Sequence, residues 1–283
     1  MKKRKLFILI FIFVIVVGIT YAFTYRKTES PKIPEKIQEI PQILPTGSTE
    51  VKPKINTEVK SVKEITPDTK KLETSNSPKY KIIDRSVIVP EGKTDNKKVV
   101  LLTVDDGPSS QALAMVEVFK KHNAKAIFFI NGVHDGAHKG VIEKIKEEGF
   151  AIGNHTWNHL DLKKEKNTKT IDKEIDTNTN LINKITGENP KFFRPPYGDT
   201  SPYVIKYVKE HGMIEMNWSN AAKDWEKSAR EKDVFVSNAV KDIQSGAIIL
   251  MHEHPWSLAN LDALLTDLKL KGYSFVDPKD IVE

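Results

Sequence analysis

Four short segments of this sequence carry side chains that could together bind a metal ion and move protons: Asp105–Pro108, His155–His159, Arg194–Gly198 and Leu250–His252. Two histidines and a carboxylate can hold a metal ion, and a second carboxylate, an arginine and a third histidine remain for proton transfer. A metal-assisted hydrolase needs this set of groups, because the metal polarises a carbonyl and lowers the pKa of a bound water. The elements between the segments must then bring them together.

Metal binding would fall to the two histidines and to one aspartate of the first segment. His155 and His159 are four residues apart, and a helical turn would place both imidazoles on one face. Asp105 and Asp106 follow a strand, where neighbouring side chains point in opposite directions, so one can reach a metal while the other faces a substrate. Two histidines and one aspartate equal the three protein ligands of a catalytic zinc. The alternatives are a solvated histidine pair and an aspartate that caps a helix.

The remaining segments carry groups for proton transfer and substrate contact. Arg194 lies in a proline-rich loop and could hold a carboxylate through two hydrogen bonds, or lie on the surface beside a turn. His252 ends an apolar strand, where a histidine can protonate a leaving group near neutral pH, and His254 is close enough to take its place. Asp224 and Trp225 follow another strand, and this tryptophan either packs in the core or lines a groove the size of a sugar.

These segments follow apolar strands in a chain where strands and helices alternate. Strands are predicted over residues 98–104, 126–130, 150–153, from 192, and over 213–218, 247–251 and 273–276. Helices are predicted over residues 109–122, 139–148, 168–185, 202–211, 232–244 and 258–270. Near-continuous apolar strands that alternate with helices indicate an α/β fold with parallel strands. Because polar residues follow the strands in five places, the pattern favours closure into a barrel with its active site at the carboxyl ends of the strands.

The first 96 residues are expected to lie outside the catalytic domain. A basic cluster at residues 2–5 precedes an uncharged run over residues 6–24. At about 1.5 Å per residue, such a run can cross a hydrocarbon core of roughly 30 Å. Residues 1–25 are therefore predicted to be a membrane anchor that leaves the rest of the chain outside the cytoplasm. The alternative is a signal segment that is cleaved to release a secreted protein.

A linker is predicted between this segment and the domain. Residues 26–96 are rich in proline, lysine and threonine and contain too few apolar residues to form a core, although a candidate edge strand lies near residues 81–89. Proline-rich chains are extended, so the linker could carry the domain into a cell wall. The catalytic domain is predicted to span residues 97–283, which is long enough for one core.

Composition argues against several other classes of protein. The formal net charge is +6, but a basic cluster at residues 2–5 accounts for most of it, and no basic and aromatic patch indicates nucleic-acid binding. The chain contains no cysteine, which excludes a disulfide framework and a lipid-modified cysteine. No glycine-rich dinucleotide fingerprint follows the first strand, which argues against a Rossmann fold.

In this order, the segments resemble the five motifs of the polysaccharide deacetylases, the family-four carbohydrate esterases. The matching segments are Thr103–Pro108, His155–His159, Arg194–Tyr197, Asp224–Trp225 and Leu250–His252. The resemblance extends from about residue 97 to residue 276 and implies a distorted, incomplete (β/α) barrel. Within the family, an anchor and a linker that face the wall favour a resemblance to the peptidoglycan N-acetylglucosamine deacetylases.

The resemblance implies a role for each matched residue. Asp105 is similar to the family's general base, and Arg194 matches the residue that orients this base. His252 matches the catalytic acid, and Asp224 matches the partner that tunes the acid. The residues that match the family's metal ligands, usually to zinc, are Asp106, His155 and His159. The residues that match its substrate contacts are Tyr197, through its backbone N–H, and Trp225 and Leu250, as walls of the acetyl pocket.

Two residues depart from the family pattern: Val104 replaces the usual phenylalanine of the first motif, and Ala221 replaces the first acidic residue of the fourth. The expected function is metal-dependent removal of N-acetyl groups from N-acetylglucosamine units of a cell-wall polysaccharide, with peptidoglycan as the expected polymer. Chitin oligomers and acetylated xylan are alternative substrates. The two departures leave open a catalytically impaired protein that only binds wall polymer. A muramic-acid deacetylase is less favoured, since the aspartate that is altered in those proteins is intact here as Asp106.

Overall fold

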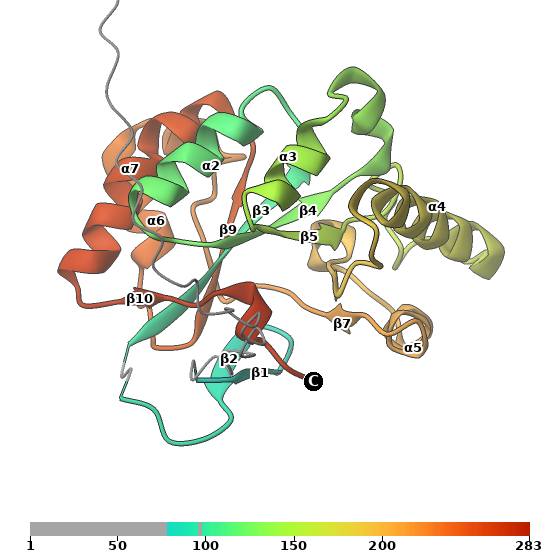
Figure 1. Cartoon of the computed structure of the whole chain (residues 1–283), viewed down its shortest axis with the longest axis horizontal. Helices are drawn as coiled ribbons and strands as arrows, with labels where there is room; N and C mark the ends of the chain where they lie inside the picture. The colour runs from blue at the N-terminus through green and yellow to red at the C-terminus, as the bar shows by residue number, and fades with distance from the viewer. Residues whose placement is uncertain (1–77, 96–97) are drawn as a thin grey trace, which may run out of the picture. The chain divides into compact units, whose positions relative to one another are not determined.

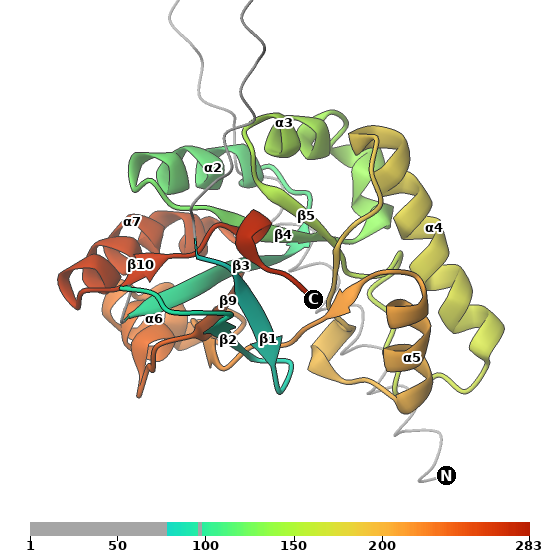
Figure 2. The ribbon, with the colours of Figure 1, turned by 60° about the horizontal axis from the view of Figure 1, so that its bottom comes forward.

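The computed structural model describes residues 78–95 and 98–283. The predicted membrane segment, residues 1–25, and most of the predicted linker lie outside this part of the chain. Within the described residues, no helix is both long and apolar enough to cross a membrane. The described chain forms one sheet of ten strands flanked by helices (Figure 1, Figure 2).

Parallel strands form the centre of the sheet, in the order β9–β3–β4–β5–β6–β7, with β8 beside β9 and β10 beside β3. Their bounds are β3 (Val99–Gly107), β4 (Ala126–Ile130), β5 (Ala151–Asn154), β6 (Phe192–Phe193), β7 (Ile214–Glu215), β8 (Asn220–Ala221), β9 (Ala247–His252) and β10 (Ser274–Phe275). Each lies where a strand was predicted except β8, which no predicted strand covers, and β7 takes up only two residues of the strand expected over 213–218. Between them, the backbone of Asn217 bonds to Arg85 instead of to a neighbouring parallel strand.

An antiparallel hairpin precedes the parallel strands. β1 (Tyr80–Ile83) and β2 (Val87–Pro90) pair across a turn in which Asp84 and Arg85 have positive φ, and β2 pairs antiparallel with β9. The strands predicted within the domain are parallel, whereas the hairpin adds antiparallel pairs at this edge, so the sheet is mixed. The hairpin lies in the segment predicted as linker, near the candidate edge strand over 81–89. It covers the start of β9, whose backbone groups would otherwise be unpaired at a sheet edge.

Helices follow most of the parallel strands, as the alternating pattern predicted. The α-helices are α2 (Ala112–Lys121), α3 (Val141–Glu147), α4 (Thr168–Thr186), α5 (Pro202–Glu210), α6 (Lys232–Val240) and α7 (Pro255–Leu270). Short 3₁₀ helices are η1 (Gly132–Ala137), η2 (Pro196–Gly198), η3 (Lys227–Arg230) and η4 (Pro278–Asp280). The largest differences from prediction are at α6, which ends four residues earlier, at α2, which begins three residues later, and at α7, which begins three residues earlier because proline suits a first helical turn.

The two faces of the sheet contact different apolar clusters. One cluster, on the inner side of the curved sheet, contains Val99, Leu101, Ile127, Phe129, Phe192 and Ile248. The alternate residues of β3, Val100 and Leu102, pack with residues of α2 and α7 in the other cluster. Because side chains alternate along a strand, Thr103 and Asp105 continue the inner row of β3 towards its carboxyl end. The alternation therefore directs Asp105 into the mouth of the curved sheet.

The sheet curls without closing through strand pairing, since its order ends at β1 and β7. These two ends meet at the hairpin turn. The guanidinium of Arg85 makes two hydrogen bonds to the carboxylate of Glu215, and the N–H of Asn217 donates to the carbonyl of Arg85 over 2.5 Å. An ion pair and a single backbone bond thus take the place of a strand ladder, as an incomplete barrel requires.

Candidate active site

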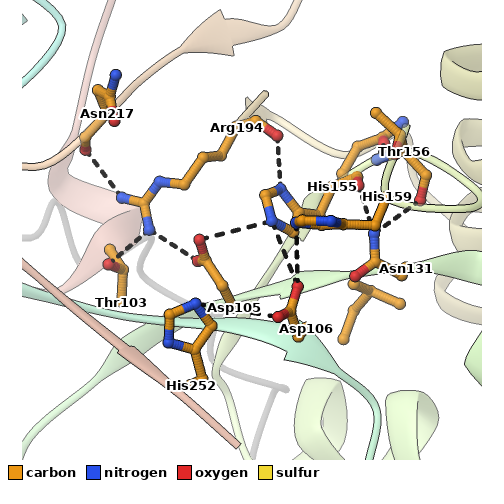
Figure 3. Close-up of polar contacts among 12 residues, drawn as sticks. Thr103, Asp105, Asp106, Asn131, His155, Thr156, His159, Arg194, Asn217 and His252 are labelled. Carbon is orange, nitrogen blue, oxygen red and sulfur yellow. Dashed lines mark hydrogen bonds and ion pairs between the residues drawn. The ribbon is translucent and has the colours of Figure 1, made fainter. Parts of the chain in front are cut away.

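A cavity of about 440 Å³ lies at the carboxyl ends of the parallel strands. It is lined by Asp105, Asp106, His155, His159, Tyr197, Trp218, Trp225, Leu250 and His252. Arg194 and Asp224 are fully buried behind its wall, where they bond to Asp105 and His252 (Figure 3 shows Arg194 and Asp105). The structure therefore brings residues from all five sequence motifs to one place.

The end of β3 is bent so that both aspartates face the cavity. The pairing of β3 with β4 shifts between Val104 and Gly107, which marks an irregularity in the strand, and Asp106 has a φ of 67°. A regular strand would point the two carboxylates in opposite directions, whereas the left-handed residue turns Asp106 to the same side as Asp105. Glycine is needed next, because a Cβ on Gly107 would lie 2.2 Å from Oε1 of Glu253.

The segment that carries the two histidines is not the helical turn that was predicted. It is an irregular loop after β5, in which Thr156 and His159 have φ values of 69° and 58°. The imidazoles nevertheless converge, with the ring centroids of His155 and His159 5.0 Å apart. Their Nε2 atoms lie 3.6 and 3.5 Å from Oδ1 of Asp106 (Figure 3). The backbone that brings these residues together is therefore set by the loop and not by a helix.

The three side chains fit a divalent metal ion. Asp106, His155 and His159 each offer one ligand atom, and these atoms lie within 4.8 Å of one another. Oδ1 of Asp106 is buried without a hydrogen-bond partner among the described residues. Nδ1 of His155 donates to the carbonyl of Arg194 at 2.7 Å, which leaves the lone pair on Nε2 facing Asp106. Burial lowers the pKa of His155 to about 3, so its imidazole is neutral, as a ligand must be.

Asp105 lies beside this group and is held by Arg194. One Nη of the arginine donates to Oδ1 of Asp105 and to Oγ1 of Thr103, each over 2.8 Å, and the other donates to the carbonyl of Asn217 over 2.9 Å. Burial raises the pKa of Asp105, while the guanidinium opposes this increase. A fixed, desolvated carboxylate with a raised pKa is suited to accept a proton.

His252 faces the same cavity and is held by Asp224. Nδ1 of His252 donates to Oδ1 of Asp224 over 2.7 Å, and Oδ2 accepts from the backbone N–H of His252 and from Oγ of Ser257. Burial acts to lower the pKa of His252, but the hydrogen bond and charge of Asp224 outweigh it and raise the pKa to about 9. The imidazole is therefore protonated at neutral pH. His254, the alternative to His252, stacks on it at 5.6 Å and does not line the cavity.

Aromatic side chains flank the mouth of the cavity. Tyr197 is 64% exposed and its ring lies 4.6 Å from that of His159, while Trp225 is 52% exposed and meets His252 edge-on at 5.7 Å. Leu250 is buried in the floor. Of the two options for Trp225, core or groove, the structure favours the groove.

Several contacts of the site could not be found from sequence spacing. Asn217 and Ser257 hold Arg194 and Asp224 through single bonds across the fold, and no motif marks them. Ala221 lies in β8 opposite Leu250, where its methyl group offers no carboxylate, and Nε of the buried Arg194 has no hydrogen-bond partner within the described residues. β8 therefore supplies no carboxylate at this position of the family pattern.

Known proteins with this sequence pattern identify the family. The family model described as polysaccharide deacetylase matches residues 92–216. A peptidoglycan-N-acetylglucosamine deacetylase of Bacillus cereus is 33% identical over 187 residues, which cover 64% of this chain and 67% of that protein. This chain belongs to the polysaccharide deacetylase family. The membership in this family that the five motifs predicted is therefore confirmed.

Other members of the family differ in length and activity. The peptidoglycan-N-acetylglucosamine deacetylase PgdA of Listeria monocytogenes is 33% identical over 73% of this chain, but the matched part spans only 44% of that relative. The peptidoglycan-N-acetylmuramic acid deacetylase PdaA of Bacillus subtilis is 34% identical over 66% of this chain and 72% of its own. Among solved structures, a mutant of the CE4 family pseudoenzyme BA3943 with restored enzymatic activity has a TM-score of 0.61, with 29% identity over 66% of this chain and 68% of that chain. The fold is thus that of the polysaccharide deacetylases.

Proposed function

We propose that this protein is a metal-dependent hydrolase that removes N-acetyl groups from the N-acetylglucosamine units of a cell-wall polysaccharide, with peptidoglycan as its substrate. One observation carries the proposal. Asp106, His155 and His159 form a fitting metal site between a carboxylate held by an arginine and a protonated histidine held by a carboxylate. The relatives named as peptidoglycan deacetylases support the choice of polymer.

The side chains divide the work of amide hydrolysis. Asp106, His155 and His159 would hold the ion, and two imidazoles with one carboxylate suit zinc. A bound ion would supply Lewis acidity and an activated water. Asp105 accepts a proton from the attacking water while Arg194 keeps its carboxylate in place. His252 donates its proton to the departing amine nitrogen as the C–N bond breaks. The products are acetate and a free amine on the sugar.

Substrate contacts are assigned to the walls of the cavity. Leu250 and Trp225 enclose the acetyl methyl group, and the backbone N–H of Tyr197 donates to the developing oxyanion. The exposed rings of Tyr197 and Trp225 border the cavity on the sides of His159 and His252, where neighbouring sugar units of a polymer would pass. We further propose that the chain acts outside the cytoplasm, where peptidoglycan lies, and that residues 1–25 anchor it to the membrane or direct its secretion.

Acetate release is the direct test. Peptidoglycan, chitin oligomers and acetylated xylan would each be incubated with the full chain, with Zn²⁺ or with a chelator. We expect acetate from peptidoglycan, loss of release with the chelator, and recovery when Zn²⁺ is restored. Mass spectrometry of digested product separates deacetylated glucosamine from deacetylated muramic acid. Replacing Asp105 by Asn should leave zinc binding intact and lower turnover by about 100-fold or more.

The second candidate is a wall-binding protein with an impaired site. Two features favour it: Ala221 offers no carboxylate, and Nε of Arg194 has no hydrogen-bond partner in the part of the chain that the structure describes. This candidate predicts sedimentation of the chain with peptidoglycan but no acetate in the presence of Zn²⁺. That result, or full turnover by the Asp105→Asn variant, would contradict the catalytic proposal.

A further inference from the structure

The loop between the two histidines is bound from one side by Glu174 of α4. The carboxylate accepts two hydrogen bonds from Asn158, one from its backbone N–H and one from Nδ2, each over 2.7 Å. The backbone carbonyl of Glu174 accepts a third from the N–H of Trp157 over 3.0 Å. One residue of α4 thus binds the two loop residues that directly precede His159.

The burial of Glu174 indicates that these bonds are needed. The residue is 9% exposed, and a buried carboxylate costs stability unless its oxygens accept hydrogen bonds. The loop also needs contacts from outside it to stabilise its backbone, because Thr156 and His159 lie in the left-handed region that residues other than glycine rarely adopt. The hydrogen bonds therefore serve both sides: they compensate the burial of the Glu174 carboxylate, and they stabilise the backbone of the loop.

The first half of the loop is held separately, by buried asparagines. Nδ2 of Asn131 donates to the carbonyl of His155 over 2.5 Å, and Oδ1 of Asn154 accepts from the N–H of Thr156 over 2.8 Å. Asn178, one turn of α4 beyond Glu174, donates to the same Oδ1 over 2.9 Å. These bonds fix the backbone near His155. The backbone leading to His159 is bound by Glu174 and, at the carbonyl of Trp157, by the N–H of Val133 over 3.1 Å, so Glu174 is the partner that binds Asn158.

We propose that Glu174 is a positioning residue for the metal site, which it serves by holding the Trp157–Asn158 backbone so that His159 reaches Asp106. The inference rests on the proposed function, because it assumes that Asp106, His155 and His159 bind a metal ion. His159 is the more exposed of the two imidazoles, with 28% of its side chain accessible against 3% for His155. Loss of the hydrogen bonds from Glu174 would therefore displace His159 more than His155.

The test compares zinc affinity in variants of Glu174 with that in a matched variant of the same helix. Glu174→Gln keeps the shape of the side chain but offers one acceptor to two donors, and Glu174→Ala offers none. Asp176 is the control, because this carboxylate of α4 accepts from the hydroxyl of Tyr207 on α5 and does not contact the loop. Affinity for Zn²⁺ is measured by competition with a chromogenic chelator, and folding by thermal unfolding without metal.

We expect zinc to bind about 10-fold more weakly to Glu174→Gln and up to about 100-fold more weakly to Glu174→Ala, as for other residues that orient metal ligands. Asp176→Asn should lower the melting temperature without changing zinc affinity. Adding Asn158→Asp to Glu174→Gln restores a donor and acceptor pair with its roles exchanged, and should recover part of the affinity.

The outcomes separate this inference from the proposed function. If the unaltered chain binds no Zn²⁺, the proposed metal site itself is wrong. If the unaltered chain binds Zn²⁺ and the well-folded Glu174→Gln variant binds it equally tightly, the positioning role is overturned. An equal loss in Asp176→Asn would also overturn it, because the effect would then follow general destabilisation of α4.

Discussion

At the scale of single residues, the site contains two pairs with opposite tasks. Arg194 presents a positive charge to Asp105, and Asp224 presents a negative charge to His252. Burial raises the pKa of Asp105. Burial acts to lower the pKa of His252, but Asp224 outweighs this effect and raises that pKa to about 9. One pair is thus prepared to accept a proton and the other to donate one, which is the division that amide hydrolysis requires.

Replacing Asp224 by Asn is expected to lower the pKa of His252, because the charge that outweighs burial is removed. In the proposed mechanism the protonated imidazole is the active form, so activity is expected below this pKa and is expected to be lost as pH rises through it. We expect the basic limb of kcat against pH, near pH 9 in the unaltered chain, to move down by at least about one unit, and kcat at neutral pH to fall by about 100-fold. An unchanged basic limb would show that another group donates the proton.

Sequence spacing singled out candidate residues that the structure places around one cavity, but it did not indicate the side chains that hold them. The alternation along β3 is local, so the inward direction of Asp105 follows from the pattern of apolar residues before it. The contacts that hold the site are not local. Ser257 reaches Asp224 from α7, and Asn217 reaches Arg194 from the chain after β7. No period in the sequence indicates such single bonds between distant segments.

At the scale of elements, two irregular backbones determine where the candidate metal ligands lie. The end of β3 leaves its register at Asp106, and the loop after β5 passes through left-handed residues at Thr156 and His159. A spacing of four residues is compatible with a helical turn as well as with this irregular loop. The predicted helical turn at His155–His159 was therefore wrong, although the spacing allowed it. The loop adopts its shape because side chains of α4 and neighbouring strands bind its backbone, and local propensity does not include those partners.

Replacing Gly107 by Ala tests the irregular end of β3. The new Cβ would lie 2.2 Å from Oε1 of Glu253 and 2.9 Å from Cδ1 of Ile130, so these side chains or the backbone must move. Overpacking of this kind costs about 1–3 kcal/mol of stability. We also expect weaker zinc binding, because Asp106 is the preceding residue. Thermal unfolding and zinc titration measure the two effects.

A matched substitution and a second change sharpen this test. Gly136→Ala is the control, since nothing lies within 4 Å of the added Cβ, and it should leave both quantities near their original values. Adding Glu253→Ala to Gly107→Ala removes the nearest obstacle and should return part of the stability. Equal stability of Gly107→Ala and Gly136→Ala would refute the packing argument at this turn.

At the scale of the whole described fold, the site is connected to the place where the sheet ends meet. The hairpin turn binds β7 and the chain after it through Arg85, which pairs with Glu215 of β7 and accepts from the N–H of Asn217. The carbonyl of Asn217 in turn accepts from Arg194, which holds Asp105. The alternation of strands and helices predicted the parallel sheet, but this junction joins residues about 130 positions apart and could not be read from periodicity.

Removing the Arg85–Glu215 pair is therefore expected to affect both stability and catalysis. The Glu215 side chain is 5% exposed and that of Arg85 is 37% exposed, so Glu215→Gln should cost about 1–3 kcal/mol, less than the loss of a fully buried pair. The exposed pair between Lys81 and Glu91, in the same hairpin, is the control, and Glu91→Gln should change stability by less than about 1 kcal/mol. Denaturant unfolding measures both.

The same variants show whether the contact between the two ends of the sheet affects the position of the proposed base, Asp105. Asn217 links the hairpin turn to Arg194, so Glu215→Gln is expected to lower kcat about 3- to 10-fold. Zinc affinity is expected to stay unchanged, because the candidate metal ligands lie on β3 and the loop after β5. Loss of zinc affinity would instead indicate that the whole carboxyl end of the sheet has loosened. A destabilised variant with unchanged kcat would show that the junction supports the fold alone and leaves Asp105 undisturbed.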